Sequence, residues 1–153
     1  MNYDSWKGTL DHIQNVRLKI YKVVEDLLRR SLLHDMSKLE APEKEIYDKY
    51  TPLLNGMEYG SPVYRETISK MKVGVDHHYT NNRHHPEYFP DGINAMNLVD
   101  LIEMLCDWKA AGERHNLKPI DIFQSIEINA GRFKIDPQLK QILLNTATYL
   151  WYD

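Results

Sequence analysis

The chain is poor in cysteine, since Cys106 is the only one among its 153 residues. An intrachain disulfide is therefore excluded, and a bound metal would have to be held by nitrogen and oxygen ligands rather than by a thiolate cluster. A chain with so little cysteine also suits a reducing compartment. We therefore expect a cytoplasmic protein.

Long hydrophobic runs and excess positive charge are missing too. No stretch approaches the roughly 18 apolar residues of a membrane span, and the opening residues MNYDSW lack the cationic start and apolar core of a signal peptide. The formal net charge of -3 provides no basic field that would attract a nucleic-acid polymer or an anionic membrane. We expect neither of these as a partner.

Period-2 alternation is also absent, whereas apolar residues recur with a 3.6-residue period along nearly the whole chain. This pattern predicts an all-α fold, and the length suits a single domain spanning residues 1–153. We expect about six helices separated by turn signals, with a loop over 80–92. The first helix is expected from about Thr9 to a turn near residue 26, after which a short helical segment runs into His34. The five later helices are expected over Pro42 to Asn55-Gly56, Ser61-Pro62 to His78, Ala95 to Arg114, Ile120 to Arg132, and Asp136-Pro137 to Leu150. The aromatic end, Tyr149 to Tyr152, is expected in the core or at a contact between subunits of a homo-oligomer.

Histidine is the informative residue type that is present. Six of the seven histidines fall into three blocks, which are His12, the pair His34-Asp35, and the run His77-His78 with His84-His85. Neutral imidazole nitrogens and carboxylate oxygens bind divalent ions such as Zn, Fe, Mn, Co and Ni. The blocks therefore predict parts of one metal site. His78 continues the apolar line of its helix, so we expect it to be buried.

The first two blocks can meet only if the chain turns between them. An unbroken helix would separate His12 from His34 by about 33 Å at 1.5 Å per residue. Asp26 is an acceptable N-cap that could start a fresh helix. We therefore predict a turn between Val24 and Arg30, and a continuous helix over this segment would exclude a site shared by the two histidines.

Carboxylates on the fourth predicted helix could complete the site. Asp100 and Asp107 are seven residues apart and share one face, with Glu103 between them. They lie at the edge of an apolar stripe, where a carboxylate needs a partner such as a cation. Because they are about 10.5 Å apart along the axis, one could ligate a metal while the other orients a ligand.

Together these residues resemble the HD-domain superfamily of metal-dependent phosphohydrolases, which is all-helical. The resemblance covers about Leu10 to Ala111 and is most specific at LLHDMSK, residues 32–38. The spacing from His12 to His34 is short for that superfamily, and Ser37 stands where a glycine is usual. The resemblance implies an HD-type helical bundle.

The resemblance also implies roles for individual residues. The primary metal ligands would be His12, His34 and Asp35, with a helical aspartate that is Asp107 or Asp100, and we narrowly prefer Asp107. A second metal position would use His78 with His84 or His85. One or two divalent ions are implied, and Mn, Fe, Co, Ni, Zn and Mg are not distinguished.

The predicted activity is hydrolysis of a small phosphorylated metabolite, in the first place a nucleotide. Asp35 and Lys38 are the predicted catalytic residues, and Lys38, Arg83 and His85 the predicted substrate-binding residues, since a guanidinium grips phosphate in bidentate fashion. The histidine loop also has aromatic neighbours that could stack on a base, namely Tyr79, Tyr88 and Phe89. Two alternatives remain open, a di-iron oxygenase on the same scaffold and a non-enzymatic binding module stabilised by metal.

Overall fold

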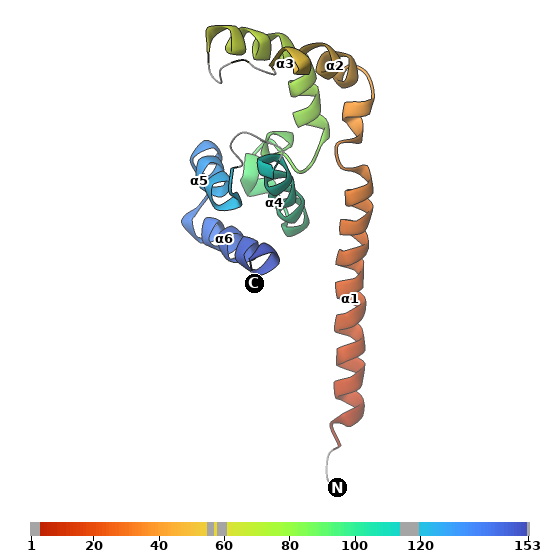
Figure 1. Ribbon diagram of the computed structural model, residues 1–153. Coiled ribbons are helices and arrows are strands. Elements are labelled where there is room, and N and C mark those ends of the chain that lie inside the picture. Colours follow the sequence, from red (N-terminus) through yellow and green to blue (C-terminus); the bar gives the residue numbers. More distant parts are fainter. Residues whose placement is uncertain (1–3, 55–56, 58–60, 114–119, 153) are drawn as a thin grey trace. The chain divides into compact units, whose positions relative to one another are not determined.

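The computed structural model (Figure 1) describes residues 4–54, 57, 61–113 and 120–152, and over these residues the fold is all-α, as predicted. The chain divides into two compact units, Met1–His34 and Asp35–Asp153. A single domain over residues 1–153 stays a prediction.

The first unit contains one helix, α1, which runs unbroken from Trp6 to Leu33 over 28 residues. The predicted turn near residue 26 is therefore wrong. The Asp26 carboxylate does not cap a new helix, because it binds Arg29 at 2.6 Å and Arg30 at 3.0 Å one turn further along the same helix. No glycine or proline interrupts residues 10–33, so nothing in the backbone opposes continuation.

The continuous helix decides the relation between His12 and His34. Both lie along a single axis, 22 residues and about 33 Å apart, so they cannot bind one ion from the same chain. The predicted site that joins these two residues in one chain is therefore wrong. His34 caps the end of α1, where its backbone N–H donates to the carbonyl of Arg30 at 2.7 Å.

Among its described residues, the second unit holds five further α-helices and three short 3-10 helices. In chain order these are η1 (Met36–Leu39), α2 (Glu43–Leu54), α3 (Pro62–Asn81), η2 (Pro86–Tyr88), η3 (Gly92–Ala95), α4 (Leu98–Glu113), α5 (Ile122–Phe133) and α6 (Pro137–Trp151). The predicted helix ends at Asn55-Gly56 and Arg114 lie outside the described residues. The predicted loop over 80–92 is shorter than expected, because α3 continues to Asn81 and two 3-10 helices follow.

Capping side chains set the starts of the later helices. Ser61 accepts a hydrogen bond from the backbone N–H of Tyr64 at 3.2 Å, and Asp136 accepts one from Gln138 at 2.8 Å. Both helices have proline in the first turn, where its missing N–H costs nothing. These two predicted helix starts are confirmed.

The main hydrophobic core of the second unit lies among η3, α4, α5 and α6, and α5 contacts both α4 and α6. Its most deeply buried side chains are Met104, Leu105, Ile122, Ile126 and Ala147. At the C-terminus, Trp151 packs against this core while Tyr149 is exposed. No helix among the described residues has both the length and the apolar composition needed to cross a membrane.

Helices α2 and α3 form a second packed pair, and Gly74 sets how closely they approach. A Cβ built at Gly74 would lie 3.0 Å from the Cγ2 atom of Ile46. Gly74 lies one helical turn before His78, and Ile46 lies three residues after Glu43. This contact therefore helps to position Glu43 and His78, whose side chains are joined by a hydrogen bond.

We expect Gly74→Ala to lower the free energy of unfolding by about 1–3 kcal/mol, because the added methyl group overpacks the contact with Ile46. Gly131→Ala is the matched control. Nothing lies within 4 Å of a Cβ at Gly131 inside α5, so the better helix propensity of alanine should stabilise the protein by about 0.5–1 kcal/mol. Urea unfolding measures both, and a Gly74→Ala protein as stable as wild type would contradict the tight packing.

Candidate metal centre

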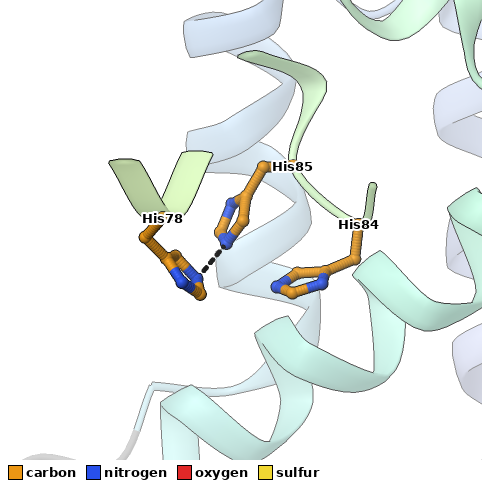
Figure 2. A group of neighbouring side chains, drawn as sticks. All are labelled: His78, His84 and His85. Atoms are coloured by element: carbon orange, nitrogen blue, oxygen red, sulfur yellow. Dashed lines mark hydrogen bonds between the residues drawn. The ribbon is translucent and has the colours of Figure 1, made fainter. Parts of the chain in front are cut away.

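Three imidazole rings from α3 and the loop after it turn toward one another (Figure 2). The rings belong to His78, His84 and His85, and one ring nitrogen of each lies within 4.8 Å of the others. The Nε2 atoms of His85 and His78 are 2.9 Å apart. His78 and His84 are each only 2% exposed, so the predicted burial of His78 is confirmed. Pro86 holds His85 in an extended conformation, which aims its ring back toward α3.

Asp35, the first residue of the second unit, adds a carboxylate to these rings. Its Oδ1 atom lies 3.2 Å from Nε2 of His78 and 3.4 Å from Nε2 of His84. Bonds of about 2.0–2.1 Å from one ion to such ligands would place neighbouring ligand atoms about 2.8–3.0 Å apart in octahedral geometry and about 3.3–3.4 Å apart in tetrahedral geometry. The donor atoms and their spacing therefore fit a divalent cation.

The backbone of Asp35 is strained. Its φ of 60° lies in the left-handed region, which aspartate tolerates better than most residues but still at a cost. Lys134, at the end of α5, has the same left-handed conformation with a φ of 51°, which is common where a helix ends. Asp35 is therefore a functional candidate through its contacts and not through its conformation.

The two oxygens of the Asp35 carboxylate face different partners. While Oδ1 faces the histidines, Oδ2 accepts from Lys38 Nζ at 2.6 Å. Burial favours the neutral acid, but the nearby His78 and His84 rings and the Lys38 ammonium group outweigh it and hold the pKa of Asp35 well below its usual range. The Asp35 carboxylate is therefore ionised, as a metal ligand must be. Its Oδ2 atom is paired with the ammonium group of Lys38.

His85 is held neutral. Burial lowers its pKa, as do the neighbouring His84 and His78, and the result is about 3 even though Asp107 and Asp35 act in the opposite direction. A neutral imidazole keeps a lone pair for a metal. His85 therefore belongs with the ligand candidates rather than with substrate binding alone.

The shift at His85 predicts a pH dependence of stability. Between about pH 6.5 and 3 the unfolded chain binds a proton at His85, whereas the folded protein does not. Acid therefore favours unfolding, and the equilibrium constant for unfolding rises by up to about tenfold for each pH unit. Urea unfolding of chelator-treated protein over this range should show a shallower pH dependence in His85→Gln. Equal slopes in the two proteins would contradict the shift.

Two carboxylates not predicted from the sequence as partners of the histidines contact the Nδ1 atoms on the other side of the rings. Glu43, at the start of α2, contacts Nδ1 of His78 at 2.9 Å, and Glu103 on α4 lies 3.4 Å from Nδ1 of His84. Histidine ligands of metals ordinarily bind such a group with their other nitrogen. Glu43 resembled a routine helix-start acid in the sequence, and only the packing of α2 on α3 brings it to His78.

The structure pairs two of the predicted site residues, Asp100 and Arg83, with each other. Asp100 is fully buried and accepts two hydrogen bonds from the guanidinium of Arg83, at 3.1 and 3.0 Å, and a third from the backbone N–H of Asn97. The Arg83 guanidinium also stacks on Tyr88 and Phe89. This cluster fastens the histidine loop to α4, and the metal-binding role of Asp100 and the substrate-binding role of Arg83 stay predictions.

The other predicted residues divide between the two units. The charge of Asp107 acts to raise the pKa of His85. Asp107 therefore stays preferred over Asp100 as the predicted metal ligand from α4. Lys38 lies beside Asp35, and His77 contacts Glu43 Oε1 at 2.7 Å. His12 and His34 belong to the first unit, and their part in metal binding stays a prediction.

These features define an all-helical protein with a histidine and carboxylate cluster suited to a divalent ion. The chain belongs to the family described as "Family of unknown function (DUF5662)", which it matches over residues 1–149. No curated protein and no solved structure matches it. The resemblance to the HD-domain superfamily stays a prediction.

Proposed function

We propose that this protein is a metal-dependent phosphohydrolase whose ion is held by Asp35, His78, His84 and His85. The main support is that the Nε2 atoms of two buried histidines, His78 and His84, both lie close to the Oδ1 atom of the ionised Asp35 carboxylate. A divalent ion bound by such ligands lowers the pKa of its water and polarises a phosphoryl oxygen. Three nitrogens and one oxygen suit Zn, Fe, Mn, Co or Ni better than Mg.

Lys38 supplies the second element of the proposal. Its ammonium group lies 2.6 Å from Asp35 Oδ2, so a phosphoryl group near the ion would also lie near this cation. A fixed positive charge there would stabilise the negative charge that develops on phosphoryl oxygens. A simple structural metal site has no need for a lysine against its ligand carboxylate.

We propose a small phosphate ester as the substrate, with nucleotides as the first class to test. The Tyr79 ring packs against the His85 ring with centroids 4.6 Å apart, so an aromatic face borders the cluster. Tyr88 and Phe89 are instead occupied with Arg83. Arg132 also lies over the Tyr79 ring, but because Tyr79 borders the cluster we propose it as the residue on which a base would stack. A cytoplasmic location fits both the substrate class and the single cysteine.

The test is phosphate release from a panel of nucleoside mono- and triphosphates, cyclic nucleotides and simple phosphate esters, each assayed with Mn, Co, Ni, Zn and Fe(II). We expect hydrolysis of at least one class that a chelator abolishes and added metal restores. Protein that retains metal but hydrolyses nothing in the panel would contradict the proposed activity. Oxygen consumption by iron-loaded protein would point to an oxygenase instead.

A further inference from the structure

Glu43 is a fully buried carboxylate at the centre of a hydrogen-bonded cluster next to the candidate metal centre. Its side chain is 0% exposed, although it is the first residue of α2. Its Oε1 contacts Nδ1 of His77 at 2.7 Å, and its Oε2 contacts Nδ1 of His78 at 2.9 Å. A buried carboxylate is costly unless donors surround it, so this arrangement calls for an explanation.

The hydrogen bonds around Glu43 determine where the proton of His78 lies. The two N–H groups of the Asn82 side chain donate to Ser37 Oγ and to the backbone carbonyl of His78, both at 2.8 Å. Ser37 then donates its single proton to Glu43 Oε2 at 3.1 Å. His78 Nδ1 also lies 3.0 Å from Asn82 Nδ2 and 3.3 Å from Ser37 Oγ, but the Glu43 oxygen at 2.9 Å is nearer and can only accept, so Nδ1 carries a proton and donates it to Glu43.

That tautomer has a direct consequence for the other nitrogen of the ring. A neutral imidazole with its proton on Nδ1 has a lone pair on Nε2. Nε2 of His78 is the atom that faces Asp35 Oδ1 and His85 Nε2. The neighbouring His77 places its Nδ1 on the same carboxylate, but its side chain is 39% exposed and it does not take part in the three-histidine cluster.

We propose that Glu43 is a positioning residue that fixes His78 as the Nδ1–H tautomer and so distinguishes it, as a metal ligand, from the adjacent His77. The metal-binding half of this inference rests on the proposed function, whereas the tautomer half stands on the hydrogen bonds alone. Removing a carboxylate that orients a ligand histidine typically weakens metal binding by about 10–100-fold.

The closing experiment combines two readouts on the full chain. Nitrogen-15 NMR of the imidazoles in chelator-treated protein near pH 7.5 reports the tautomer of His78, and titration with Zn and with Mn reports affinity. In wild type we expect the proton on Nδ1. Glu43→Gln keeps the shape but offers an amide donor to Nδ1, so we expect a shift toward the Nε2–H tautomer and a 10–100-fold loss of affinity. Glu45→Gln, an exposed residue of the same helix turn, should match wild type in both readouts.

The outcomes separate the two claims. A wild-type spectrum with the His78 proton on Nε2 would overturn the proposal without any variant, which covers the case in which Glu43→Gln fails to fold. Wild-type affinity in a folded Glu43→Gln protein would also overturn it. If wild type shows the Nδ1–H tautomer and Glu43→Gln changes it, but wild type binds neither metal, the metal centre fails and the tautomer assignment holds.

Discussion

Replacing His84 with glutamine is expected to weaken divalent-metal binding by roughly 100-fold or more, since it removes a ligand nitrogen from the centre of the cluster. The His84 ring is 2% exposed and its Nε2 lies 3.4 Å from Asp35 Oδ1, so no other side chain can take its place without repacking. Glutamine keeps much of the volume and the polarity. Isothermal titration with Zn or Mn measures the loss, and phosphate release should disappear with it.

His77→Gln is the matched control for this variant. It removes an imidazole that is one residue from a ligand and that contacts Glu43, but whose ring lies outside the three-histidine cluster. We expect its metal affinity to stay within about threefold of wild type, because the other oxygen of Glu43 still holds His78. Equal losses of metal affinity in His84→Gln and His77→Gln would contradict the assignment of His84 as a metal ligand.

The second large effect is expected at Lys38. Lys38→Met should lower the rate of phosphate release by about 10²–10³-fold, because the charge that stabilises the phosphoryl oxygens is lost. Metal affinity should change much less, since the Asp35 oxygen that Lys38 contacts is not the one that faces the histidines. Steady-state kinetics on the most reactive panel member, with metal content measured in parallel, separates the two effects.

Lys44→Met provides the control for loss of a lysine. Lys44 lies on the exposed side of α2, where it pairs with Asp48 one turn away. Exposed pairs of this kind contribute little, so both rate and stability should be unchanged. A fall in metal content equal to the fall in rate in Lys38→Met would reassign Lys38 from the reaction to holding Asp35 in place.

The sequence predicted the helical class and the burial of His78 correctly because both follow from local patterns. The 3.6-residue period defined the helices, and the same period placed His78 on the buried line of α3. The clustering of His84 and His85 in the predicted loop indicated that imidazoles from this segment take part in one site with His78. These features need no knowledge of which helices pack on which.

The errors came from competing interactions that a single sequence does not rank. Asp26 could cap a new helix or bind arginines along an existing one, and the structure shows the second. For Asp100, position on α4 suggested a metal ligand, and the sequence did not show that Arg83 from the histidine loop contacts both of its oxygens. Glu43 required the packing of α2 on α3, set by Gly74, before it could be seen as a partner of His78.

The central claim is that the second unit holds one divalent ion at Asp35, His78, His84 and His85. Elemental analysis of purified, metal-loaded and dialysed protein tests it most directly when wild type is read beside His78→Gln. We predict about one ion per chain in wild type and close to none in the variant, with both proteins folded by circular dichroism. Equal metal content in the two proteins, or no retained metal in wild type, would contradict the account.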